Sequence, residues 1–225
     1  MLRANEVTLG QLLKDNGYTT GMFGKWHLGD NFPYRPEDRG FDEVYRHGGG
    51  GVGQTPDVWD NAYFGGSYFH NGEIVPAEGF CTDVFFRQAR KFIKKQVEAG
   101  QPFFAYISTN APHGPLHCPQ KYLDMYPSQS QKIAAFYGMI TNIDDNVGAT
   151  RKFLKELGVS DLASLARIPS SSLKERLGSE GGELSRLARA EYDRFPPRYI
   201  PLEQPEVGLE FEPALSGYEP LQFVS

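Results

Sequence analysis

Two stretches of the sequence are followed by basic side chains that could bind an anion. Residues 18–23 precede Lys25 and His27, and residues 102–108 precede His113. Both stretches are short and apolar, as buried strands are, and in an extended segment Lys25 and His27 point the same way. If the two strands run parallel, Lys25 and His113 lie at one edge of the sheet, where ligands bind in α/β folds. A lysine and two histidines there would suit sulfate, phosphate or carboxylate.

Spacing alone leaves a second interpretation open, in which each histidine is a hydrogen-bonded loop residue and Lys25 is solvated. The remaining histidines are expected in loops: His47, His70 and His117. Asp144 and Asp145 are adjacent carboxylates, but successive helix positions point in different directions. They cannot bind one metal ion together, so we expect them on a solvated helix face.

The elements that must position these residues alternate between helix and strand. Thr8 and Gln11 form a capping box before a short helix that ends at Gly17, and Asn71-Gly72 is typical of a hairpin turn. Further helices are expected from Thr82 to Gly100 and over residues 130–157. In the second of these, seven apolar residues keep helical spacing: Ile133, Phe136, Tyr137, Ile140, Ile143, Val147 and Leu154. The alternation predicts an α/β fold with a mainly parallel sheet, in which residues 102–108 are buried on both faces.

Composition excludes several classes of protein. The 225 residues are 40% hydrophobic and 23% charged, which is ordinary for a globular protein and excludes wholesale disorder. The longest stretch without charged or strongly polar residues, 133–140, is far too short to span a bilayer. A net charge of −5 argues against a nucleic-acid-binding surface over the whole chain. Cys81 and Cys118 lack CxxC spacing, so we expect two plain thiols and neither a zinc ribbon nor a disulfide scaffold.

The chain divides into two segments of different composition. Residues 1–159 hold all five histidines and nine of the ten lysines, whereas residues 160–225 hold six arginines, one lysine and 7 of the 16 prolines. This shift predicts two domains of different origin, 1–159 and 160–225. The first ten residues contain no apolar region of the kind a secretory signal has, so we expect no export signal on the chain as given.

The first segment contains the motif GYTTGMFGKWHLG, followed by RPEDRGFDEVY, PFFAYISTNAPHGP and AAFYGMITNIDDNVGATRKFLKELGV. The first motif resembles the second signature of type I sulfatases of the arylsulfatase kind, and the others resemble the segments that accompany it, so the resemblance extends from residue 5 to residue 159. The resemblance implies part of an alkaline-phosphatase-like sulfatase sandwich and a sulfuric ester hydrolase. It also implies a sulfate ester or a sulfated carbohydrate as the ligand. Members are often periplasmic or secreted, and localisation is left open.

The resemblance also implies roles for the three basic residues. Lys25 and His27 match the lysine and histidine of the GKWH signature, which hold the sulfate oxygens and the oxidised nucleophile. His113 matches the histidine that donates to the sulfate ester or its leaving group. These roles fit the chemistry, because fixed cations neutralise a sulfuryl group in transfer and an imidazole can protonate a departing alkoxide. Family selectivity comes from loops, and residues 48–66 are the insertion-like loop here.

The family's nucleophile and metal ligands have no counterpart in this sequence. The family converts the cysteine of Cys-x-Pro-x-Arg to formylglycine, but Cys81 lies in FCTDV and Cys118 in HCPQK. It also binds Ca²⁺ through an acidic pair on an early strand and an Asp-Asn pair after the long helix. Where that later strand is expected, the chain has SDLASLARIPSSSLKERLG. We therefore expect no metal site and no activity from this chain alone.

The second segment, with the junction before it, begins with LKELGVSDLASLARIPSSSLKERLGSEGGELSRLARAEYD. This stretch resembles the helix-hairpin-helix region of Y-family DNA polymerase-like proteins, and irregular structure or short strands are expected after it. In that family the hairpin contacts phosphates through its backbone. Here residues 160–225 carry 7 basic and 11 acidic residues, a poor match for DNA. Three functions therefore stay open: an incomplete sulfatase, a non-catalytic module that binds anions or sulfated glycans, and weak DNA binding through the tail. The oligomeric state is left open.

Overall fold

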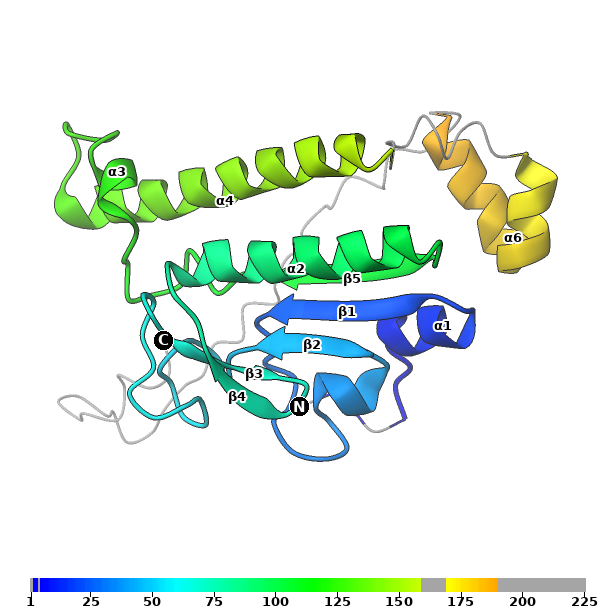
Figure 1. The fold of residues 1–225 in the computed structure, drawn as a ribbon, viewed down its shortest axis with the longest axis horizontal. Coiled ribbons are helices and arrows are strands. Elements are labelled where there is room, and N and C mark those ends of the chain that lie inside the picture. The colour runs from blue at the N-terminus through cyan, green and yellow to red at the C-terminus, as the bar shows by residue number, and fades with distance from the viewer. Residues whose placement is uncertain (1, 4, 159–168, 190–225) are drawn as a thin grey trace, which may run out of the picture. The chain divides into compact units, whose positions relative to one another are not determined.

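The computed structural model describes residues 2–3, 5–158 and 169–189 (Figure 1). The chain divides into two compact units, Met1–Ser160 and Asp161–Ser225, and each is described by itself. None of the helices in the described ranges is long and apolar enough to cross a membrane.

A five-stranded sheet with the order β4-β3-β2-β1-β5 forms the centre of the first unit. Its strands are β1 (Thr19–Gly24), β2 (Glu43–Arg46), β3 (Ser67–His70), β4 (Glu73–Pro76) and β5 (Phe103–Ser108). β1 pairs in parallel with both β2 and β5, whereas β3 pairs antiparallel with β2 and β4. Four of the described strands therefore run in one direction, which confirms the predicted α/β fold with a mainly parallel sheet.

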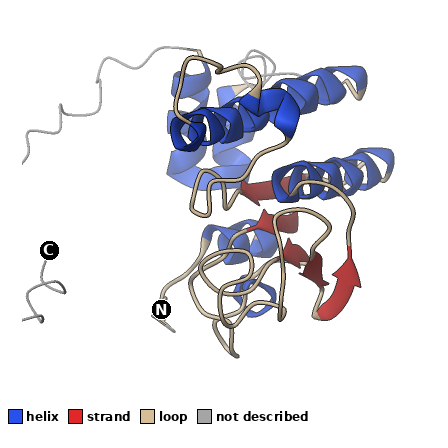
Figure 2. Cartoon of the chain, turned by 90° about the vertical axis from the view of Figure 1, so that its left-hand side faces the viewer, coloured by secondary structure: helices blue, strands red, loops and turns tan. Residues whose placement is uncertain are grey.

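The described helices of this unit lie on both sides of the sheet. They are α1 (Leu9–Asp15), the 3₁₀ helix η1 (Pro36–Arg39), α2 (Cys81–Glu98), α3 (Gln120–Leu123) and α4 (Gln131–Glu156). Two of them, α2 and α4, lie in successive layers over one face of the sheet, and α1 lies beside the other face. The helix α2 packs on the sheet, and α4 packs on the far side of α2 (Figures 1 and 2). The main core lies between sheet and α2 and includes Phe23, Tyr45, Tyr68, Phe85 and Phe92. A smaller cluster covers the other face: Met22, Trp26, Phe41 and Val44.

Two local predictions are confirmed. The hydroxyl of Thr8 accepts from the backbone N–H of Gln11 (3.1 Å), and the Gln11 side chain accepts from the N–H of Thr8 (3.0 Å). Asn71 and Gly72 connect β3 to β4 with φ angles of 50° and 92°, as a tight hairpin turn of the I′ type requires.

Two predictions are wrong in detail: the residue at which α2 begins, and the burial of both faces of β5. The helix α2 begins at Cys81 with Phe80 as its N-cap, so Thr82 lies inside the helix and is buried. β5 is half-buried instead of buried on both faces, and Tyr106 is 41% exposed. The reason is that α2 covers only the face of β5 on which Ala105 lies, whereas Tyr106 lies on the opposite face.

The helix α4 is confirmed, but its apolar stripe does not face the core. Five of the seven apolar residues are exposed: Ile133, Phe136, Tyr137, Ile140 and Val147. The buried side of α4 consists instead mainly of small and polar residues, together with Met139. Oδ1 of Asp83 on α2 accepts from the side-chain amides of Asn142 (2.7 Å) and Asn146 (2.6 Å). Because this carboxylate needs buried donors, it determines which side of α4 packs on α2.

In the second unit the structure describes α6 (Ser170–Ala188). Its backbone is broken at Gly178, where φ is 63°, so two shorter helical pieces follow one another. The irregular segment predicted after the helical region of the tail, with its many prolines, lies outside the described residues.

Candidate functional site

Lys25 and His113 follow the carboxyl ends of neighbouring parallel strands. β1 and β5 pair over their whole length, from Thr19 opposite Phe103 to Gly24 opposite Ser108. The pairing continues one step further, because the N–H of Lys25 donates to the carbonyl of Ser108 (2.6 Å). The predicted parallel pairing of these strands is confirmed, and it carries both basic residues to the same edge of the sheet.

His27 does not lie in an extended continuation of β1, as the prediction that it points the same way as Lys25 had assumed. The strand β1 ends at Gly24, and His27 has a left-handed backbone with φ of 56°, so the side-to-side alternation of a strand does not reach it. Trp26 is buried and its indole N–H donates to the carbonyl of Tyr34 (2.7 Å), whereas His27 is exposed and Lys25 is half-buried. The interaction of Trp26 with Tyr34 thus determines the course of the turn.

A glycine-rich loop lies against the ring of His27. A Cβ added to Gly50 would be 2.8 Å from Cε1 and Nε2 of that ring, so only a glycine allows this approach. Oδ1 of Asp57 accepts from the N–H of Gly48 (2.7 Å), and Oδ2 accepts from the N–H of Gly53 (2.7 Å). The loop is thereby held by a carboxylate while its backbone forms one wall of the site.

His47 lies in the loop after β2, as the sequence predicted, and its side chain is completely buried next to the glycine-rich loop. Its Nδ1 lies 2.7 Å from the carbonyl of Gly48 and must donate to it, since a carbonyl only accepts. Burial lowers the pKa of His47, the positive charges of Lys25 and Arg46 lower it further, and Asp57 opposes them. His47 is therefore neutral at pH 7, with Nε2 as an acceptor that has no hydrogen-bond partner among the described residues.

His70 also differs from the prediction, because it is the last residue of β3 and not a loop residue. Its Nε2 lies 2.8 Å from the Glu43 carboxylate. His117 is exposed in a loop, as expected, and the exposed Asp144 and Asp145 lie on α4.

The side chain of His113 is exposed, and its backbone carbonyl is held by a hydrogen bond from Tyr63. Its Nδ1 lies 2.7 Å from the carbonyl of Gly114, to which it donates. The Nε2 atom therefore carries a proton only in the imidazolium form. The Tyr63 hydroxyl donates to the carbonyl of His113 (3.1 Å), and burial raises the pKa of that hydroxyl. Among the described residues, no hydrogen bond or ring contact joins His113 to Lys25 or His27; the edge of the sheet at which Lys25 and His113 lie is what relates them.

The residues present do not fit a calcium site or an oxidised cysteine nucleophile. Within the described part of the chain, no three His, Cys, Asp or Glu side chains lie close enough to hold a metal ion. Cys81 is fully buried at the start of α2, and burial raises its pKa to about 12. Cys118 is also buried, and both thiols are free, as the sequence predicted.

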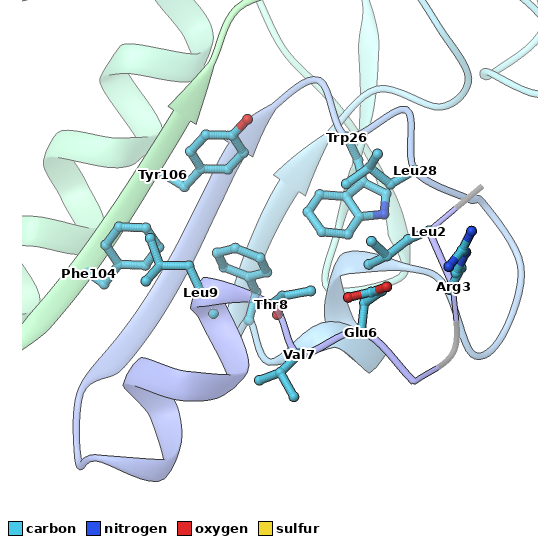
Figure 3. A pocket seen from close by; sticks show the side chains of 12 residues that line it. Leu2, Arg3, Glu6, Val7, Thr8, Leu9, Trp26, Leu28, Phe104 and Tyr106 are labelled. Atoms are coloured by element: carbon cyan, nitrogen blue, oxygen red, sulfur yellow. The ribbon is translucent and has the colours of Figure 1, made fainter. Parts of the chain in front are cut away.

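An apolar pocket of about 670 Å³ lies on the sheet face away from α2 (Figure 3). Its walls come from the N-terminal segment, α1, β5 and the turn after β1, and include Leu2, Leu9, Trp26, Phe104 and Tyr106. Lys25, His27 and His113 do not line it, so this pocket is separate from the candidate anion site.

The chain matches the family model described as Sulfatase over residues 2–168. An arylsulfatase of Klebsiella aerogenes is 33% identical over 131 residues, which cover 56% of this chain and 28% of the relative. The N-acetylgalactosamine-6-sulfatase of Canis lupus familiaris is 30% identical over 165 residues, which cover 69% of this chain and 31% of the relative. The crystal structure of Ps i-CgsB in complex with k-i-k-neocarrahexaose has a TM-score of 0.61 and 31% identity, covering 68% of this chain and 37% of that one.

This chain belongs to the sulfatase family, and its described first unit has the α/β fold of that family. It spans about a third of the length of the relatives that it matches. The family assignment made from the sequence motifs is confirmed, whereas the resemblance of the tail to Y-family polymerases stays a prediction.

Several residues that shape the site were not expected from the sequence. The buried His47, the supporting Tyr63 and the carboxylate of Asp57 belong to it through tertiary contacts. The run of four glycines after His47 was the available signal, since glycines let a backbone approach a ring or ligand closely. The sequence had marked residues 48–66 as the loop in which family selectivity would lie.

Proposed function

We propose that this chain binds the sulfate group of sulfated carbohydrates through Lys25, His27 and His113, and that it does not hydrolyse them by itself. The observation that carries the proposal is that Lys25 and His113 follow adjacent parallel strands in a chain of the sulfatase family. The names of its relatives point to sulfated sugars as the ligand class: N-acetylgalactosamine 6-sulfate for one, a carrageenan oligosaccharide for another.

The three side chains suit a tetrahedral anion. The half-buried ammonium of Lys25 offers three donors to sulfate oxygens, at a position where partial burial strengthens each contact. The exposed ring of His27 is held against Gly50 and can donate from the other side. His113 can donate from Nε2 only when it is protonated, because its Nδ1–H donates to Gly114.

Catalysis needs groups that this sequence does not contain. In the family, formylglycine supplies the nucleophile and Ca²⁺ orients the sulfate. Cys81 is neither in the modification motif nor exposed, and Cys118 lies outside the motif as well. Lys25, His27 and His113 alone can hold a sulfate ester and move a proton, but they offer no attacking group for sulfur.

Calorimetry tests the binding proposal. Purified chain is titrated with potassium sulfate and with N-acetylgalactosamine 6-sulfate. Lys25→Gln should weaken binding about tenfold, as expected for a lost charge-assisted hydrogen bond. Lys152→Gln is the matched control, because Lys152 is an exposed lysine on α4 and its loss changes the net charge equally. The proposal would be contradicted if Lys25→Gln and Lys152→Gln bound sulfate equally well. It would also be contradicted if His113→Ala left the heat of sulfate binding unchanged.

A turnover assay tests the absence of hydrolysis. The chain is incubated with an aryl sulfate and Ca²⁺, before and after co-expression with a formylglycine-generating enzyme. We expect no release of sulfate above the level of Lys25→Ala in either preparation. Turnover that depends on Lys25 would show that a nucleophile exists in this chain and would overturn this part of the proposal.

A further inference from the structure

A second pocket, of about 520 Å³, lies next to the loop that carries His113. Its lining comes from the loop before β3, from the loop after β5, from α3 and from the start of α4: Phe64, Leu116, His117, Cys118, Leu123, Gln131, Lys132 and Ala135. Small-molecule sites in proteins typically have volumes of roughly 300–1,000 Å³. The pocket is therefore large enough for a sugar residue with its substituents.

Tyr63 connects this pocket to the candidate sulfate site. Its hydroxyl donates to the carbonyls of His113 (3.1 Å) and Gly114 (3.2 Å). The same ring contacts the ring of His117 edge-on, with 5.9 Å between the centroids, and His117 lines the pocket. His113 and His117 are four residues apart, so their backbones are separated by at most about 14 Å. One oligosaccharide can span that distance.

The lining has the chemistry of a site for an anionic sugar. Phe64 leaves 47% of its surface exposed, and its ring offers an apolar wall on which the C–H face of a sugar can pack. Lys132, Gln131 and His117 supply polar groups for hydroxyl or sulfate oxygens. None of the described residues that line the pocket is acidic. Lys132 also lies in the first turn of α4, where the helix dipole favours negative charge.

We propose that this pocket is a subsite for a neighbouring sugar residue of a sulfated glycan, with Lys132 binding a second sulfate group on that residue. The inference rests on the proposed function, since it places the first sulfate at Lys25, His27 and His113. It assigns the preference for a chain of sugars over a single one to Phe64, His117 and Lys132. A glycan with sulfates on adjacent residues is the ligand class that uses both positions.

Calorimetry can separate binding at the sulfate site from binding in this pocket. The three probes are potassium sulfate, N-acetylgalactosamine 6-sulfate and k-i-k-neocarrahexaose. The hexasaccharide should bind more tightly than sulfate. Lys132→Gln should weaken hexasaccharide binding by about two- to fivefold at low salt, the range of an exposed ion pair, and leave sulfate binding unchanged. Lys152→Gln removes the same charge from an exposed position on the same helix, outside the pocket, and should change neither affinity. The imidazole signals of His117 in NMR spectra should move with the hexasaccharide and not with sulfate.

The outcomes distinguish this inference from the proposed function. If Lys25→Gln weakens sulfate binding but Lys132→Gln and Lys152→Gln have equal effects on the hexasaccharide, the subsite is refuted and the sulfate site stands. If hexasaccharide and sulfate bind equally well, the subsite is also refuted. If Lys25→Gln changes neither affinity, or if no probe binds, the proposed function fails and the subsite fails with it.

Discussion

Two glycines on α4 provide a sharp test of how this helix packs. Gly138 faces α3, where a Cβ would be 2.6 Å from Sγ of Cys118 and 3.1 Å from Cβ of Tyr122. Gly148 lies on the same helix with no atom within 4 Å of its added Cβ. Both have ordinary helical backbones, so replacement by alanine lowers the conformational entropy of the unfolded chain equally at the two positions.

The two substitutions are expected to change the free energy of unfolding in opposite directions. Gly148→Ala should stabilise the first unit by about 0.5–1 kcal/mol, the helix propensity difference between glycine and alanine. Gly138→Ala gains the same term but forces Cys118 and the Tyr122 backbone to move. Overpacking of this kind costs about 1–3 kcal/mol, so a net loss of up to about 2.5 kcal/mol is expected. Because the helix propensity gain is common to both, the two variants should differ by the overpacking cost alone, about 1–3 kcal/mol.

Urea unfolding followed by tryptophan fluorescence measures this difference, since Trp26 is buried in the folded chain. The double variant Gly138→Ala, Cys118→Ala should recover part of the loss, because the smaller side chain makes room for the new methyl group. If Gly138→Ala stabilises the chain as much as Gly148→Ala does, Cys118 and Tyr122 do not pack on α4 at this position.

Three further predictions concern single residues. Because burial lowers the pKa of His47 below that of an unfolded histidine, near 6.5, its stabilising contribution is present above pH 6.5 and is lost as the pH falls toward the folded pKa. Urea unfolding from pH 7 to pH 5 should therefore show a smaller loss of stability for His47→Gln than for the unaltered chain, and equal losses would contradict a buried neutral imidazole. Thr8→Ala should lower the free energy of unfolding by about 1 kcal/mol through loss of the cap on α1, and no change in thermal unfolding would mean that the cap contributes nothing. Since burial raises the pKa of Cys81 to about 12, iodoacetamide at pH 8 should leave Cys81 unmodified in the folded chain and alkylate it in urea; mass spectrometry of the peptides would reveal the contrary.

Some features of this protein were determined by short stretches of its sequence. The capping box of Thr8 and Gln11 and the turn at Asn71-Gly72 involve residues at most three apart, so their geometry does not depend on distant contacts. The α/β fold and the family followed from helix–strand alternation and from the motifs around Lys25 and His113. The parallel pairing of β1 with β5 was also predictable, because two short apolar strands joined by long connections favour a parallel sheet.

Other features were decided only by the tertiary structure. The apolar stripe of α4 predicted a buried face, yet the buried side is the one that meets Asp83, which lies 59 residues before Asn142 in the sequence. The direction of His27 depends on the contact between Trp26 and Tyr34, and the burial of His47 depends on packing against Phe85 of α2, with 6.1 Å between the rings. Helical periodicity and motif spacing describe how side chains point relative to their own backbone. Which of them become buried, and which remain available to a ligand, is determined by the partners that the fold brings from elsewhere in the chain.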